Sequence, residues 1–249
     1  MADIQAAAIG LPGPVDTATG VAGSSSVLPN WRNANIIDLF RRQLGDIPLW
    51  VDNDANLAAL GELRWGEARG LTNFIFVKGS TGVGACIYLN GEIFRGAYGA
   101  AGEIGHLAIP EERTACRCGN RGCLETVSST PALLRHVVGA YPEATDLASL
   151  KSIYQVDASA IGRTLFDMGA SLGMHLAHLC TILDIDRVVI GGELAEFSSD
   201  YIDGARETTM RWVHPQLAPK IRVDRSALGS SGGMLGAATA ARQLAVLAP

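Results

Sequence analysis

The sequence predicts an α/β protein, because short apolar runs typical of buried strands alternate with stretches that have helical periodicity. Pro48–Asp52 is one such run, and a helical stretch begins directly after it at Ala55. Arg187–Ile190 is another, followed by the turn Gly191-Gly192 and a further helical stretch. Ligands of open α/β sheets bind beyond the carboxyl ends of the strands, so the end of the strand at Pro48–Asp52 is a candidate ligand site.

The remaining elements follow in order along the chain. Ala6–Leu11 is expected to be a buried strand entering a turn, and Asp16–Ser26 a loop or hairpin before a short helix at Ile36–Leu44. Asn90-Gly91 is a strong hairpin signal. Further strands are expected at Asn73–Lys78, Gly84–Leu89, Glu92–Phe94 and near Ile221–Asp224. Further helices are expected from Thr130, near Tyr201–Trp212 and in the alanine-rich C-terminal stretch.

The longest predicted helix follows Asp157, which is expected to cap it. Its apolar residues recur at a spacing of about 3.6, as in an amphipathic helix with one buried face: Ile161, Leu165, Met168, Leu172, Leu176, Leu179 and Leu183. His175 and His178 lie on this helix without a cysteine or carboxylate at ligand spacing, so we interpret them as structural. The segment Tyr141–Val156 before it is less regular.

Composition restricts the classes of protein to which the chain can belong. With 249 residues, 48% of them hydrophobic and 18% charged, the chain is long and apolar enough for one large domain or two lobes. The net charge of −5 gives no electrostatic reason to expect DNA binding by this chain alone. No run of eighteen apolar residues and no signal-peptide pattern is present, so we expect a cytoplasmic protein that does not bind membranes.

Four metal-ligand residues lie within eighteen positions: His106, Cys116, Cys118 and Cys123. Three thiolates and one imidazole form the closed tetrahedral Cys₃His set of structural zinc sites. The alternative is that reduced core cysteines cluster by chance, which this short spacing disfavours. The two other cysteines, Cys86 and Cys180, are isolated and are expected to be reduced core residues.

Polar residues next to these elements are candidates for ligand binding. Two carboxylates, Glu103 and Glu125, flank the predicted zinc ligands, and a metal site would hold them at a defined separation. Asp52, Asn53 and Asp54 follow the strand at Pro48–Asp52. Helix capping would explain one residue of this trio but not three.

A glycine-rich turn, Gly79-Ser-Thr-Gly-Val-Gly84, joins two predicted strands. Small residues with hydroxyl groups allow backbone N–H groups to approach phosphate oxygens. Glycine turns also join strands that bind nothing, so the turn is open to both interpretations. The same holds for Gly191-Gly192.

The central motifs resemble the signature of the ROK family, which contains sugar-responsive bacterial repressors and sugar kinases. They read Gly102-Glu103-x-Gly105-His106, then Cys116-x-Cys118-Gly119-x₂-Gly122-Cys123-x-Glu125. The resemblance implies an actin-like, ribonuclease H-like fold with two lobes, a zinc knot and a cleft. Residues 1–53, completed by a C-terminal helix at 233–249, would form the small lobe, and residues 54–232 the large lobe with the zinc-binding motif.

The resemblance also implies roles for individual residues. In a kinase, Asp54 would be the catalytic base that deprotonates the sugar hydroxyl. The ligands of a hexose or N-acetylhexosamine would be Asn53, Asp54, Glu103, His106 and Glu125. The nucleotide-binding residues of a kinase, which would also need ATP and magnesium, would be Thr81, Gly82, Gly84, Gly191 and Gly192.

Departures from the kinase pattern favour the regulator branch of the family. The Asp-x-Gly-x-Thr strand and turn that hold ATP phosphates in ROK kinases are missing, so the first lobe is expected to be incomplete. Ser80 replaces the first glycine of the kinase Gly-Thr-Gly turn, and Val27 stands where sugar-binding ROK kinases usually have asparagine. The winged helix-turn-helix of the repressors is missing too.

We therefore predict the sugar-sensing part of a transcriptional regulator without its DNA-binding domain, assembled as a homodimer or larger. The alternative is an ATP-dependent sugar kinase of the glucokinase or N-acetylhexosamine kinase type.

Overall fold

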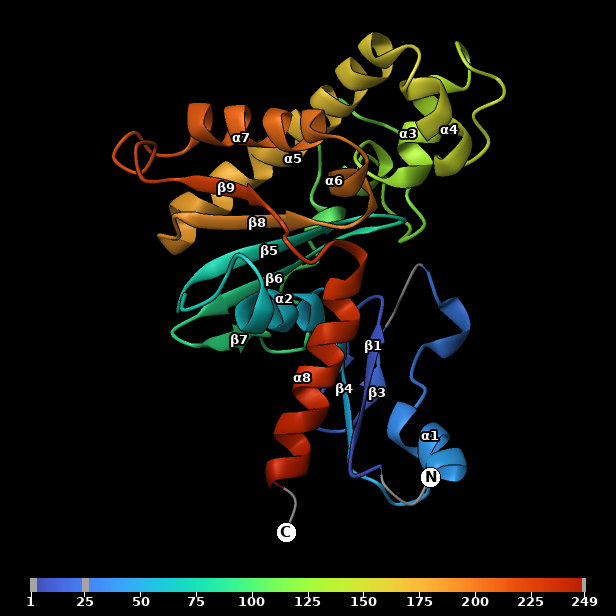
Figure 1. Cartoon of the computed structure of the whole chain (residues 1–249), viewed down its shortest axis with the longest axis vertical. Helices are drawn as coiled ribbons and strands as arrows, with labels where there is room; N and C mark the ends of the chain where they lie inside the picture. Colours follow the sequence, from blue (N-terminus) through green and yellow to red (C-terminus); the bar gives the residue numbers. More distant parts are fainter. Residues whose placement is uncertain (1–3, 24–26, 248–249) are drawn as a thin grey trace. The chain divides into compact units, whose positions relative to one another are not determined.

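Strands and helices alternate along the chain in the computed structural model, which describes residues 4–23 and 27–247 (Figure 1). The strands are β1 Ala7–Leu11, β2 Val15–Asp16, β3 Val21–Ala22, β4 Leu49–Asn53, β5 Phe74–Gly79, β6 Val83–Leu89, β7 Glu92–Phe94, β8 Arg187–Gly191 and β9 Arg222–Arg225. The α-helices are α1 Ile36–Leu44, α2 Asp54–Trp65, α3 Thr130–Val137, α4 Leu147–Tyr154, α5 Ala158–Leu183, α6 Glu193–Phe197, α7 Ser199–Trp212 and α8 Gly232–Leu247. The α/β prediction is therefore confirmed.

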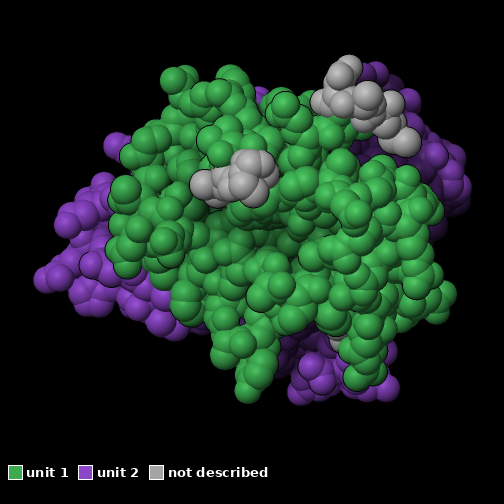
Figure 2. Space-filling model, turned by 90° about the horizontal axis from the view of Figure 1, so that it is seen from below, with its two compact units in different colours: residues 1–76, 84–103, 230–249 green, residues 77–83, 104–229 purple. Residues whose placement is uncertain are grey.

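These elements form two units, neither of which is a continuous piece of chain (Figure 2). Unit 1 consists of Met1–Phe76, Gly84–Glu103 and Ser230–Pro249, and unit 2 of Val77–Val83 and Ile104–Gly229. In this division, α2 and the β6–β7 hairpin group with the N-terminal residues. The C-terminal residues from Ser230 on belong to the same unit as the N-terminal residues, although residues 248–249 lie outside the described part.

Unit 1 is built on the parallel pair β1–β4, in which Ala7 faces Leu49 and Leu11 faces Asn53. Helix α8 packs against α2, β1 and β4 (Figure 1). Two apolar clusters fill the unit, one around Leu11, Val15, Ala22, Ile36 and Val51, the other around Leu57, Leu60 and Ala240. Short strands β2 and β3 pair within the segment expected to be a loop or hairpin, of which residues 24–26 lie outside the described part.

A five-stranded sheet has the order β7-β6-β5-β8-β9. Strands β6 and β7 form the predicted hairpin, with positive φ at both Asn90 and Gly91. Strands β5 and β6 each belong partly to unit 1 and partly to unit 2.

Unit 2 contains the parallel pair β8–β9 and the helix pair α5–α7, which lie side by side (Figure 1). The periodic residues of α5 from Ile161 to Leu176 are buried, as predicted. His175 is also buried, and burial lowers the pKa of its imidazole, which fits a structural role.

Two local expectations differ from the structure. Asp157 stands at the N-cap position of α5, but its carboxylate accepts hydrogen bonds from Tyr141 Oη and Ser159 Oγ and caps nothing. The segment expected to be irregular contains α4, whose start is fixed by a capping box between Asp146 and Ser149. None of the described helices is long and apolar enough to cross a membrane.

Candidate functional site

The four predicted metal ligands come together in unit 2. The ligand atoms of His106, Cys116, Cys118 and Cys123 all lie within 4.8 Å of one another. Cys116 Sγ lies 3.7 Å from His106 Nδ1, and Cys118 Sγ lies 3.7 Å from Cys123 Sγ. A tetrahedral zinc with Zn–S bonds of about 2.3 Å places its sulfur ligands about 3.8 Å apart. These two distances fit a tetrahedral zinc ion, and the cluster as a whole is compact enough to hold one metal ion.

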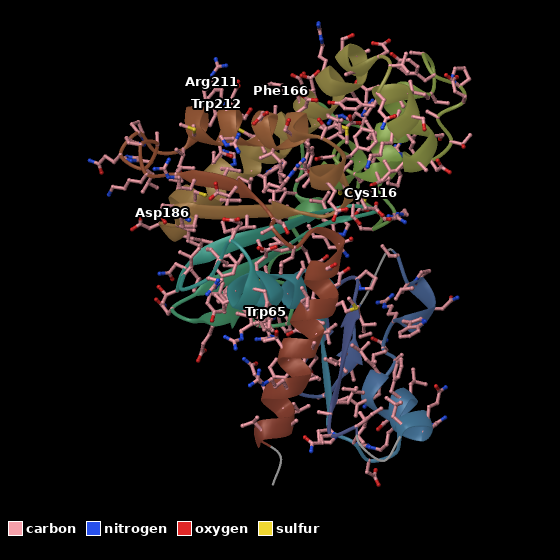
Figure 3. All side chains as sticks on the ribbon, in the orientation of Figure 1. Trp65, Cys116, Phe166, Asp186, Arg211 and Trp212 are labelled. Atoms are coloured by element: carbon pink, nitrogen blue, oxygen red, sulfur yellow. The ribbon has the colours of Figure 1, made fainter. Side chains whose placement is uncertain are left out.

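The backbone around these ligands is tightly connected. Ala108 pairs with Cys123 and Ala115 with Arg121 in isolated bridges, and Cys116 N–H donates to the Asn120 carbonyl oxygen at 2.8 Å. These contacts form a short hairpin whose turn lies between Cys116 and Cys123. Cys116 itself lies in unit 2 (Figure 3).

The three thiols of the cluster differ in pKa. Burial raises the pKa of Cys123 to about 12 and also raises the pKa of Cys116. Burial acts on Cys118 in the same direction, but hydrogen bonds, led by one from the Asn120 backbone, bring the pKa of that thiol below its usual value. Zinc binds thiolates, so metal uptake by this cluster would release protons.

The carboxylate of Glu125 lies against the glycine turn between β5 and β6. Glu125 is buried in the short 3₁₀ helix Leu124–Thr126, and its Oε2 accepts a hydrogen bond from Val83 N–H at 3.3 Å. A Cβ atom at Gly82 would lie 2.7 Å from the same oxygen. Arg117 Nη2 lies 3.3 Å from Glu125 Oε1, so one guanidinium partly balances this charge.

The two glycine turns of unit 2 lie next to each other. Gly192 has a φ of 90°, and a Cβ atom there would lie 2.4 Å from the Gly79 carbonyl oxygen, so only glycine fits. Within the first turn, Ser80 N–H donates to the Gly82 carbonyl oxygen at 2.9 Å, and Thr130 N–H donates to the Ser80 carbonyl oxygen at 2.8 Å. Thr130 Oγ1 donates to Glu193 Oε2 at 2.9 Å, which links the start of α3 to the start of α6.

At the carboxyl end of β4, Asn53 is the N-cap of α2. Its Oδ1 accepts from Ala55 N–H at 2.8 Å and from Asn56 N–H at 3.3 Å. Its Nδ2 donates to the Gly13 carbonyl oxygen at 3.0 Å. Helix capping therefore explains the presence of Asn53 among the three polar residues Asp52, Asn53 and Asp54. Asp54 is the first residue of α2.

The predicted ligands are divided between the two units. Unit 1 contains Asn53, Asp54 and Glu103, and unit 2 contains His106 and Glu125. Of the predicted nucleotide-binding residues, unit 2 contains Thr81, Gly82, Gly191 and Gly192. Gly84 belongs to unit 1, where a Cβ atom at this position would contact Ala55 of α2.

Sequence reasoning missed two charged residues near these ligands. Arg117, the central residue of Cys-x-Cys, contacts Glu125. Its position between two predicted metal ligands could have indicated that it lies near this carboxylate. Arg95 contacts Asp52 across 43 residues of sequence, and no local pattern indicates such a pairing.

Comparison with known proteins gives one consistent family. The profile of the ROK family matches residues 1–244. The glucokinase of Halalkalibacterium halodurans is 31% identical over 249 aligned residues, covering 94% of this chain and 75% of the relative. The xylose repressor of Bacillus spizizenii is 29% identical in an alignment that covers 83% of this chain. This chain spans only 53% of the repressor's length.

A solved structure shares the fold over nearly the whole chain. The ROK family glucokinase from Streptomyces griseus, determined in complex with glucose and AMPPNP, matches with a TM-score of 0.85 and 28% identity. The match covers 97% of this chain and 82% of the glucokinase. The chain thus has the α/β fold of ROK sugar kinase structures.

Proposed function

The chain belongs to the ROK family, and we propose that it is a sugar-binding member that senses a hexose or N-acetylhexosamine. In this proposal the chain is the effector-sensing part of a transcriptional regulator and binds no DNA by itself. Its net charge of −5 supports the latter point. Kinases and repressors both occur among its relatives, so the choice between them rests on the site.

The observation that carries the proposal is the position of the Glu125 carboxylate against the glycine turn. A carboxylate accepts hydrogen bonds from sugar hydroxyls but repels the negative charge of a phosphate. In the same turn, Ser80 N–H and Val83 N–H already donate within unit 2, so they are not directed at a phosphate. This arrangement favours sugar binding over phosphoryl transfer.

We propose that the sugar hydroxyls bind Asn53, Asp54, Glu103, His106 and Glu125. For His106, Nε2 would be the nitrogen that binds the sugar, a role that the position of Nδ1 next to Cys116 supports. Asn53 would donate a hydrogen bond to the sugar from Nδ2, through the hydrogen that does not bond to Gly13, because its amide oxygen caps α2. Zinc would be structural, with four protein ligands and no open position.

Calorimetric titration with a panel of hexoses and N-acetylhexosamines tests the proposal. Glu103→Ala should weaken binding of the best sugar by about 1–3 kcal/mol, the cost of leaving a buried hydroxyl without its partner. Glu92→Ala, which removes an exposed carboxylate of unit 1 on β7, is the matched control and should bind like the wild type. Equal affinities of the wild-type and Glu103→Ala proteins would place the site elsewhere.

An ATP-dependent sugar kinase is the second candidate. The contact between Gly79 and Gly192 favours it, because two neighbouring glycine turns in one unit can present several backbone N–H groups to phosphates. Asp54 would then deprotonate the sugar hydroxyl, and ATP with magnesium would supply the transferred phosphoryl group.

A coupled ADP-release assay with glucose, mannose and their N-acetylamino forms separates the two candidates. We expect binding without turnover, because a base contributes only about 10²–10⁴-fold while positioning around the phosphates supplies most of the acceleration. Sugar-dependent turnover near 1 s⁻¹, in the usual range of enzymes, that disappears in Asp54→Asn would establish the kinase instead.

A further inference from the structure

Asp52 is a charged residue that the proposed sugar ligands do not include. It precedes Asn53 on β4, and its side chain is 1% exposed. Four donors surround its carboxylate: Oδ1 accepts from Asn56 Nδ2 at 2.7 Å and from Asn53 N–H at 2.8 Å. Oδ2 accepts from Arg95 Nη2 at 2.5 Å and from Trp50 Nε1 at 3.4 Å. The carboxylate is thus fully hydrogen-bonded and holds the backbone at the start of α2.

Arg95 follows β7 and is the ionic partner of Asp52. Its side chain is 28% exposed, and its Nη1 donates to the Ile93 carbonyl oxygen at 3.4 Å. Its Nε is buried and has no hydrogen-bond partner within the described residues. A buried ion pair of this kind adds little to folding stability, since the loss of hydration offsets the attraction between the charges. The unsatisfied donor adds a further cost, so the pair is better explained by a role other than stability.

The pair connects two segments of unit 1 that both carry proposed sugar ligands. Asp52 lies two residues before Asp54, and Arg95 begins the segment that ends at Glu103. This segment is anchored again at its end, where Ala85 N–H donates to the Gly102 carbonyl oxygen at 2.8 Å. The Asp52–Arg95 contact is therefore a direct cross-link between the strand end that carries Asp54 and the segment that carries Glu103.

We propose that Asp52 and Arg95 are positioning residues that set the placement of Asp54 and Glu103 for sugar binding. The inference rests on the proposed sugar-binding function and adds a requirement to it: the affinity for the sugar depends on a charge pair that does not touch the sugar. Small displacements of hydrogen-bonding groups weaken binding steeply, so a shift of either segment lowers affinity without removing a ligand.

The test compares sugar affinity with thermal stability in a graded series of variants. Arg95→Lys keeps the positive charge but replaces the planar guanidinium, whose Nη1 and Nη2 donate to Ile93 and Asp52, by a single ammonium nitrogen on a flexible chain. Arg95→Gln and Asp52→Asn remove a charge. We expect the dissociation constant of the best sugar to rise about threefold to tenfold in Arg95→Lys and about tenfold or more in the other two. Arg41→Lys, in the exposed pair Arg41–Asp38 of α1, is the matched control and should stay within twofold.

Each outcome has a defined meaning. All titrations are run well below the melting temperature of each variant, so that only folded protein is measured. Variants that melt at lower temperature but bind the sugar like the wild type would show a merely structural pair and overturn the inference. If the wild-type protein binds no sugar of the panel, the proposed function fails and the inference fails with it. Arg95→Lys, the mildest change, decides the matter should the charge-removing variants not fold.

Discussion

At the scale of single residues, metal binding by the Cys₃His cluster would be linked to the protonation of three thiols. Without metal, the raised pKa values of Cys116 and Cys123 keep both thiols protonated at neutral pH. Zinc binds the thiolates and so lowers their effective pKa. The stability that the metal contributes is therefore present at higher pH and is lost as the pH falls.

We predict one zinc per chain, retained at neutral pH and released progressively in acid, because protons compete with the metal for the thiolates. Elemental analysis of protein dialysed over a pH series measures it. Cys118→Ala should lower the free energy of unfolding by several kcal/mol or prevent folding, because it removes a ligand of a structural metal.

Cys180→Ala is the control for this prediction, since Cys180 is buried in α5 away from the cluster and its loss should leave zinc binding intact. A wild-type protein that is folded and contains less than about half an equivalent of zinc in metal-replete medium would contradict the assignment.

The sequence predicted residues whose partners are close in the chain. The four metal ligands lie within eighteen positions, so their spacing alone indicated the cluster, and the structure brings them together. Asp52 was recognised only as part of a polar trio, because its partner Arg95 is 43 positions away. Contacts between residues so far apart in the sequence depend on how the strands pair, and the spacing of residues along the chain does not predict them.

At the scale of elements, the helix pair α5–α7 depends on glycines at the contact. A Cβ atom at Gly169 would lie 2.0 Å from the Tyr201 carbonyl oxygen, and one at Gly204 would lie 2.0 Å from the Phe166 carbonyl oxygen. Both are shorter than any allowed contact, so the two backbones touch without side chains between them. The apolar periodicity of α5 predicted its buried face but not this backbone contact.

We predict that Gly169→Ala lowers the free energy of unfolding by about 1–3 kcal/mol, the usual cost of forcing an extra methyl group into a packed contact. Urea unfolding measures it. Gly233→Ala in α8 is the matched control, because a Cβ atom there meets open space. That change should be neutral or stabilise the protein by up to about 1 kcal/mol. Equal midpoints for both variants would show that α5 and α7 can separate without cost.

At the scale of the whole molecule, unit 1 has a sheet edge that the described residues leave unpaired. Strand β1 pairs only with β4 in a two-stranded sheet. Ala7 N–H donates to the Pro48 carbonyl oxygen, so alternation along a parallel strand directs Ala8 N–H to the other edge of β1. Such an edge recruits strands of other chains.

A chain of these 249 residues is therefore expected to self-associate beyond a homodimer or to be marginally stable. Light scattering over a concentration series measures the association. Ala8→Pro should reduce it, because proline removes an N–H from the open edge without removing a hydrogen bond to β4. A monodisperse, thermally robust monomer would contradict the expectation.

The organisation of the whole chain depends on contacts between segments that are far apart in the sequence. The local sequence pattern predicted α1, α5 and the β6–β7 hairpin, since each is specified by neighbouring residues. It did not group α2 with the N-terminal residues, because that grouping depends on the packing of α8 against α2 from the far end of the sequence.

The discontinuity of unit 1 has a consequence for biosynthesis. Residues 77–83 and 104–229, which form unit 2, leave the ribosome before the residues of α8 do. The apolar residues of β1, β4 and α2 that contact α8 stay uncovered until α8 has been synthesised. The first-made part of the chain can therefore close its core only after the last described helix has formed.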